Sequence, residues 1–177
     1  KNVVMEGVQI TSNQIYGGSI GGVVGSSWGT IENCSVSGNV SGTVYVGGVV
    51  GVQISGSITG CSSSATVKGM VDVGGVAGQT NSNATLTACY ATGNVTSTGS
   101  STGYVHIGGF LGNNYTTVTA CYWKNNHEQG IGYNKKSTKA TKVDGTGVTW
   151  KNAVDAMNTA LQNAGSEWRY ELNGALP

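Results

Sequence analysis

Apolar and polar positions alternate within short segments of five to seven residues along residues 20–123. The apolar positions hold mostly β-branched or small residues, and Gly, Ser or Asn stands at the segment ends. Such alternation is typical of short β-strands that bury one face. The pattern therefore predicts an all-β structure for this part of the chain.

The segments recur in a fixed order, which indicates an internal repeat. One kind contains two adjacent glycines, and the first of each pair is Gly21, Gly47, Gly74 or Gly108. A second kind ends on a cysteine, and these cysteines are Cys34, Cys61, Cys89 and Cys121. A third, looser kind follows each of the first three cysteines and ends at Val40, Val67 or Val95.

Three short strands per repeat cannot bury a face alone, so consecutive repeats must stack about 4.8 Å apart. The prediction is a parallel β-helix, or β-solenoid, of about four coils over residues 1–123. We expect right-handed coils, because right-handed crossovers are the default between parallel strands. The predicted interior rows are Ile31/Ile58/Leu86/Val118, Val40/Val67/Val95 and the four cysteines.

The glycine pairs keep the same place in all four repeats. Either a side chain there would collide with a neighbouring coil, or the backbone needs a positive φ. The residues themselves leave both explanations open.

The four cysteines also share one place in the repeat. Stacking at about 4.8 Å would permit disulfides Cys34–Cys61 and Cys89–Cys121. Side chains in a parallel stack point the same way, however, which gives a poor disulfide dihedral angle. We therefore favour a row of buried free thiols over two bridges. Zinc fits less well, because a tetrahedral site needs converging ligands.

Composition changes after Trp123, since 12 of the 17 charged residues lie in 124–177. Apolar residues at helical spacing predict one helix at about 150–164, with Thr149 as its N-cap. A strand is predicted at about 168–172. We interpret 124–177 as a small α+β cap that covers the core and strand edges exposed by the last coil.

Few residues are suited to catalysis. Only 10% of residues are charged, and between Gly7 and Cys121 the acid–base groups other than Cys and Tyr are Glu32, Lys68, Asp72 and His106. No pair of carboxylates converges by spacing, so we expect no enzyme, no cofactor and no metal site. A carbohydrate-active enzyme stays a remote alternative, which would require Glu128 or Asp144 to fold back beside Asp72.

Charge and hydropathy exclude two other classes of partner. The formal net charge is +1, and the lysine cluster at 135–142 has no interleaved aromatic residues, which argues against nucleic acid. No apolar run approaches the length of about 20 residues that spans a bilayer, so we expect no membrane insertion. Because the chain opens at Lys1 in what reads as a strand, we expect it to be part of a longer chain.

One outward-facing set of hydroxyl groups is a candidate ligand surface. Its members are Thr59, Thr85, Thr87, Thr117 and Thr119, with Tyr90 and Tyr122 nearby. Hydroxyls beside tyrosines suit contact with a sugar. The alternative is that Thr is simply a good solvent-facing strand residue.

The cores at 22–25, 48–51, 75–78 and 109–112 have the pattern Gly-hydrophobic-hydrophobic-Gly, and in each repeat the later element that ends in Cys follows the core. They resemble the GLUG-motif repeats of bacterial surface proteins, although Val or Phe stands where the motif's name has Leu. The resemblance implies an extracellular, cell-surface location. It suggests adhesion or binding of an unknown glycan or protein, or alternatively a rigid stalk that holds another domain.

Overall fold

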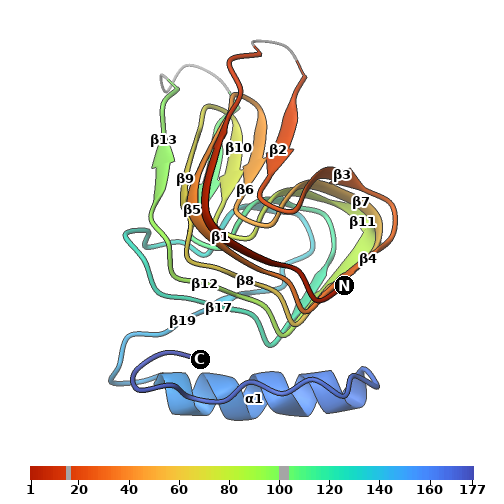
Figure 1. The fold of residues 1–177 in the computed structure, drawn as a ribbon, viewed down its shortest axis with the longest axis vertical. Coiled ribbons are helices and arrows are strands. Elements are labelled where there is room, and N and C mark those ends of the chain that lie inside the picture. Colours follow the sequence, from red (N-terminus) through yellow and green to blue (C-terminus); the bar gives the residue numbers. More distant parts are fainter. Residues whose placement is uncertain (15–16, 100–103) are drawn as a thin grey trace.

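The computed structural model describes residues 1–14, 17–99 and 104–177. These residues form a β-solenoid in which each full coil contributes to three parallel sheets, A, B and C (Figure 1). The chain runs clockwise as it recedes from the viewer in Figure 1, so the coils are right-handed. The predicted all-β class and parallel β-helix are confirmed.

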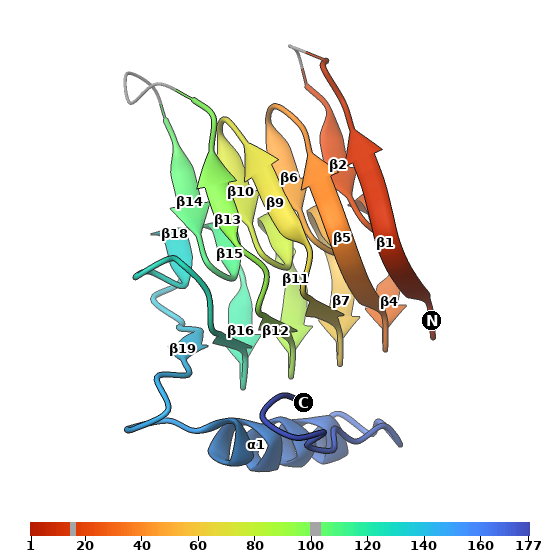
Figure 2. The ribbon, with the colours of Figure 1, turned by 60° about the vertical axis from the view of Figure 1, so that its left-hand side comes forward.

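The strands of each sheet come from successive coils and lie side by side (Figure 2). Sheet A contains β1 (Val4–Thr11), β5 (Ser35–Ser41), β8 (Ser62–Ser63), β9 (Thr66–Gly69), β12 (Tyr90–Ala91), β13 (Val95–Ser97), β17 (Tyr122–Trp123) and β19 (Thr141–Lys142). Sheet B contains β2 (Ser19–Gly21), β6 (Tyr45–Gly47), β10 (Asp72–Gly74) and β14 (His106–Gly108). Sheet C contains β3 (Val24–Ser27), β4 (Thr30–Glu32), β7 (Val50–Thr59), β11 (Ala77–Thr87), β15 (Leu111–Asn114), β16 (Thr117–Thr119) and β18 (Ile131–Asn134).

The predicted interior rows lie in register. Ile58 pairs with Ile31 on one side and with Leu86 on the other, and Leu86 pairs with Val118. Val67 likewise pairs with Val40 and Val95. All seven of these side chains are buried, and the four cysteines are buried with them. Residues one repeat apart therefore do lie above one another.

The glycine pairs are explained by close approach between coils. None of the first glycines, Gly21, Gly47, Gly74 and Gly108, has a positive φ. A Cβ on Gly74 would collide with the carbonyl oxygen of Ala77 in its own coil, and it would lie 2.6 Å from the amide nitrogen of Gly112 and 2.7 Å from Cα of Leu111 in the next coil. Because backbone atoms cannot retreat as a flexible side chain can, a methyl group at this position does not fit.

A polar row follows the bend of sheet C, and its three middle members, Gln53, Thr80 and Asn114, are buried. Ser27, Gln53, Thr80, Asn114 and Asn134 occupy one column. The Gln53 amide donates to the carbonyl of Gly29 at 2.8 Å, and the Thr80 hydroxyl donates to Asn114 Oδ1 at 2.9 Å. Because the strands bend here, some backbone groups have no hydrogen-bonding partner on the neighbouring strand. Polar side chains of this row take the place of those partners.

The last coil is closed by side chains. Trp123 continues a row of smaller inward residues, Val36, Ser63 and Ala91. Its ring fills the space over Gly130, where an added Cβ would lie 2.7 Å from Trp123 Cε3. Next to it, the Asn126 side chain bonds both the amide and the carbonyl of Val95, each at 3.0 Å. An amide side chain thus takes the place of the missing next strand on β13.

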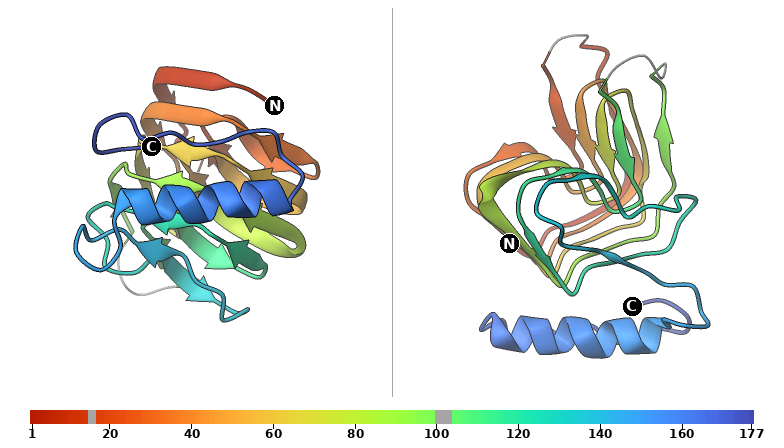
Figure 3. Two further views of the ribbon diagram at one scale, coloured as in Figure 1. Left: turned by 90° about the horizontal axis from the view of Figure 1, so that it is seen from below. Right: turned by 180° about the vertical axis from the view of Figure 1, so that it is seen from behind.

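Helix α1 (Trp150–Asn163) begins where the sequence predicts, with the Thr149 hydroxyl accepting from the amide of Asn152. It crosses the side of the stack, as Figure 3 shows from below, so the expectation that it covers the end of the solenoid is wrong. Its apolar face covers Ala88, Tyr90, Ala120 and Tyr122 at the corner between sheets C and A. These residues point out of the coil, and the helix shields them from water. The end of the solenoid is already covered by the side chains of the last coil.

Two further expectations for 124–177 are corrected. Strands β18 and β19 pair with β15 and β17, so the solenoid continues past Trp123. Residues 168–172 form no strand, and the only regular pairing nearby is an isolated antiparallel bridge between Asn173 and Leu176 among the described residues. This tail follows α1, and the Asn158 side chain of the helix bonds both the amide and the carbonyl of Tyr170.

Candidate ligand-binding surface

The predicted threonines form a regular hydroxyl face on sheet C. Thr85 pairs with Thr117, and Thr87 pairs with both Thr59 and Thr119. They flank the buried row of Leu86, so their side chains point outward. Thr85, Thr117 and Thr119 are exposed, while Thr59 and Thr87 are half-buried. The end of α1 causes part of this shielding, since Ser166 bonds to Glu32 in the same column at 3.4 Å.

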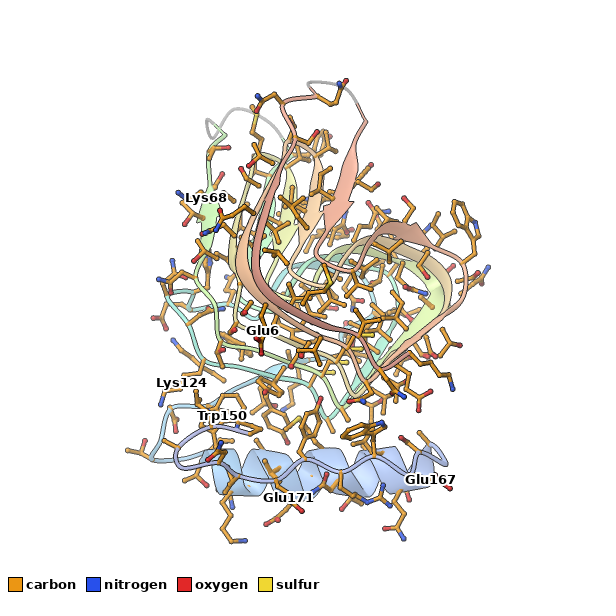
Figure 4. The ribbon with its side chains drawn as sticks, viewed as in Figure 1. Glu6, Lys68, Lys124, Trp150, Glu167 and Glu171 are labelled. Carbon is orange, nitrogen blue, oxygen red and sulfur yellow. The ribbon has the colours of Figure 1, made fainter. Side chains whose placement is uncertain are left out.

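The two tyrosines expected beside this face are covered instead. The Tyr90 hydroxyl donates to the carbonyl of Pro177 at 3.0 Å, and its ring meets Trp150 edge-to-face with centroids 5.4 Å apart. Trp150 lies between α1 and the coils (Figure 4). Tyr122 is only 9% exposed and belongs to the same cluster. Burial raises the pKa of both tyrosines. Sequence periodicity placed them outward correctly, but could not reveal the helix that covers them.

A polar cluster that we did not predict lies on sheet B and the adjoining part of sheet C. Asp72 is 3% exposed, and its carboxylate is 2.7 Å from His106 Nδ1. The other carboxylate oxygen accepts from Asn113 Nδ2 at 3.0 Å. Asn113 Oδ1 is buried and makes no hydrogen bond within the described part of the chain. The ring of His106 meets that of Tyr133, with centroids 5.1 Å apart.

The repeat itself carried the signal for this cluster. Asp72 and His106 each stand two positions before the first glycine of their pair, Gly74 and Gly108. They are therefore in register on adjacent coils, and the structure pairs them directly. The spacing of carboxylates alone does not reveal this acid and base, which stand at the same position of two adjacent repeats.

Within the part of the chain that the structure describes, no second carboxylate joins Asp72. Glu128 pairs with Lys142 at 2.9 Å, which lowers its pKa through that hydrogen bond. The Asp144 carboxylate accepts from the amides of Val148, Thr146 and Gly147, and these bonds lower its pKa. The two residues that could have revived a sugar-cleaving site thus have other partners.

The cysteine row forms a hydrogen-bonded ladder of free thiols. The amide of Cys34 donates to the sulfur of Cys61, and that of Cys61 to the sulfur of Cys89, both at 3.4 Å. Hydrogen bonding to Cys61, then burial, raises the pKa of Cys34. Burial, then the bond to Cys121, raises that of Cys89. A thiol held neutral is a poor nucleophile and metal ligand, so this row is structural.

A separate hollow of about 300 Å³ lies at the bend of sheet C. Its lining residues are Ile54, Gln79, Asn81, Ser82, Asn83 and Tyr115. Tyr115 also approaches Tyr133, with centroids 6.1 Å apart. The hollow and the Asp72 cluster are therefore joined by an aromatic contact.

A larger hollow of about 630 Å³ lies between the first coil and the segment after α1. Lys1, Glu32, Glu167 and Arg169 are among its lining residues, and Lys1 pairs with Glu32. Its charges are of both signs. In the described ranges, no helix has the length and apolar character needed to cross a membrane.

Stacked coils and in-register rows define the chain as a β-solenoid repeat protein. Two adjacent repeats, at residues 16–41 and 42–68, match the family model described as "The GLUG motif". The resemblance noted from the glycine cores is thereby confirmed. Searches of curated proteins and of solved structures found no significant match.

Proposed function

We propose that this chain is a non-catalytic repeat module of a bacterial cell-surface protein, located outside the cell, that mediates adhesion by binding a glycan or a protein. The observation that carries the proposal is the exposed hydroxyl face on sheet C. Thr85, Thr117 and Thr119 repeat there at strand spacing on the ladder of sheet C. A rigid array of hydroxyls can bind a partner without a large loss of conformational entropy.

The chemistry of the described residues supports binding over catalysis. Hydrolysis of a glycoside by the usual route needs two carboxyl groups across the scissile bond. Asp72 has His106 and Asn113 as its hydrogen-bonding partners, and neither supplies a second carboxylate.

A glycan array and a protein pull-down with the whole chain test this proposal. Thr117→Lys places a charge on the hydroxyl face and should weaken binding at least tenfold. Thr11→Lys, exposed on sheet A, is the matched control and should leave binding unchanged. Absence of binding in both assays at high protein concentration would contradict the proposal.

A rigid stalk is the second candidate function. Continuous in-register pairing from β3 through β7, β11 and β15 to β18 favours it, because such a stack resists bending. If a longer protein containing this chain binds a partner that the chain alone does not, the stalk is the better description.

A further inference from the structure

The third coil departs from the regular repeat at the bend of sheet C. The interval from the last glycine of the block to the cysteine is 9 residues for Gly25 and Gly112, 10 for Gly51 and 11 for Gly78. The extra length shifts the register between β11 and β7 after Thr80. Such bulges re-aim side chains and are frequent beside functional sites.

At the bulge, the polar residue Asn81 lies between Ile54 of the preceding coil and Tyr115 of the following coil. Asn81 follows Thr80 in the chain, as Ile54 follows Gln53 and Tyr115 follows Asn114, so these three residues occupy equivalent places on successive coils. The hollow of about 300 Å³ lies here. Small-ligand sites begin at about this volume, which suits a single sugar ring.

The groups that line the hollow are uncharged and both donate and accept. The Gln79 amide nitrogen donates to Asn81 Oδ1 at 2.9 Å, which orients both carboxamides. Within the described residues, Gln79 Oε1 and Asn81 Nδ2 make no further hydrogen bond. A hydrogen-bond acceptor beside a donor matches the hydroxyl groups of a sugar, because each hydroxyl can both donate and accept a hydrogen bond.

The Tyr115 ring supplies the apolar wall. Tyr115 is half-buried, and its ring contacts that of Tyr133 and lies 5.5 Å from Lys135 Nζ, measured to the ring centroid. An aromatic ring of fixed orientation can pack against the C–H face of a sugar at low entropic cost. Ile54 lines the same hollow from the preceding coil.

We propose that this hollow binds an uncharged sugar ring, with Gln79 and Asn81 bonding its hydroxyls and Tyr115 packing on its C–H face. This inference rests on the proposed binding function, and it names a ligand class and a place distinct from the threonine face. The absence of charged residues from the lining argues against anionic sugars as the preferred ligand.

Titration of the whole chain with lactose, cellobiose and maltotriose, followed by saturation-transfer NMR and calorimetry, tests the site. Ser82→Trp fills the hollow from an exposed position, and Tyr115→Ala removes the wall. We expect at least tenfold weaker binding from each. Trp28→Ala is the matched control, because Trp28 follows Ser27 at the equivalent place in the first coil and is 66% exposed. It should change the affinity less than twofold. Circular dichroism verifies that each variant folds.

The outcomes separate the two proposals. Unchanged sugar binding by folded Ser82→Trp, or a preference for sialyllactose over lactose, overturns the sugar site. If the chain binds a protein and none of the neutral sugars, the sugar site is wrong while the binding function stands. If it binds neither, both proposals fail.

Discussion

At the scale of single residues, the coil depends on a left-handed backbone position just before each cysteine. Asn33, Gly60, Ala88 and Ala120 all have φ between 48° and 62°. The turn directs each thiol into the core while the preceding residue faces outward. Asn and Gly adopt this conformation readily, but alanine pays about 1 kcal/mol for it.

Exchanging alanine and glycine at these turns should therefore have opposite effects. Ala120→Gly should raise the free energy of unfolding by about 0.5 kcal/mol, after the greater entropy of unfolded glycine is subtracted. Gly60→Ala should lower it by about 0.5 kcal/mol, because the smaller entropy of the unfolded alanine chain offsets part of the strain. Urea denaturation measures both. A loss of stability in Ala120→Gly would show that its methyl contact with α1 outweighs the strain.

At the scale of elements, the glycine blocks set how closely coils approach, and the hydrophobic rows only fill the space that results. Sequence periodicity found the strands, their order and the stacked rows, because one residue type returns to one environment in every coil. It could not choose between collision and positive φ for the glycines. That choice depends on the backbone atoms that surround each glycine, in its own coil and in the next.

Gly74→Ala tests the collision directly. The added methyl would meet backbone atoms of Leu111 and Gly112, so we expect a loss of about 3 kcal/mol or a failure to fold. Gly29→Ala has no heavy atom within 4 Å of the added Cβ and no positive φ, and it should change stability by less than about 0.5 kcal/mol. Thermal unfolding of the two proteins compares them. Equal stability of Gly74→Ala and wild type would mean that the backbone around Gly74 can shift enough to admit a methyl group.

At the scale of the whole molecule, the thiol column should make the protein sensitive to alkali. At Cys61, the hydrogen bond to Cys34 lowers the pKa, but the hydrogen bond to Cys89 and burial together raise it by more. The net shift of the pKa is therefore upward, as it is at Cys34 and Cys89. The unfolded chain then loses these protons at lower pH than the folded one. Stability is thus fully present below the unfolded thiol pKa of about 8.5 and falls above it.

The expected slope is about 1.4 kcal/mol per pH unit for each thiol between pH 8.5 and 10. Above that range the buried tyrosines Tyr90, Tyr122 and Tyr170 add to the loss, since burial raises their pKa as well. Urea denaturation at several pH values measures the slope. Cys61→Ala should reduce it by about a third, whatever that change does to stability at neutral pH. An unchanged slope in this variant would refute the linkage.

The sequence by itself determined the repeat, the parallel solenoid, the buried rows and the position of helix α1. Each of these follows from periodicity, a local property that recurs in every coil. Only the tertiary structure decided where α1 docks, how Trp123 closes the last coil, that Asp72 meets His106, and that one bulge opens a hollow beside Tyr115. These features arise where the repeat is broken, and there contacts between distant residues, rather than the period, fix the position of each side chain.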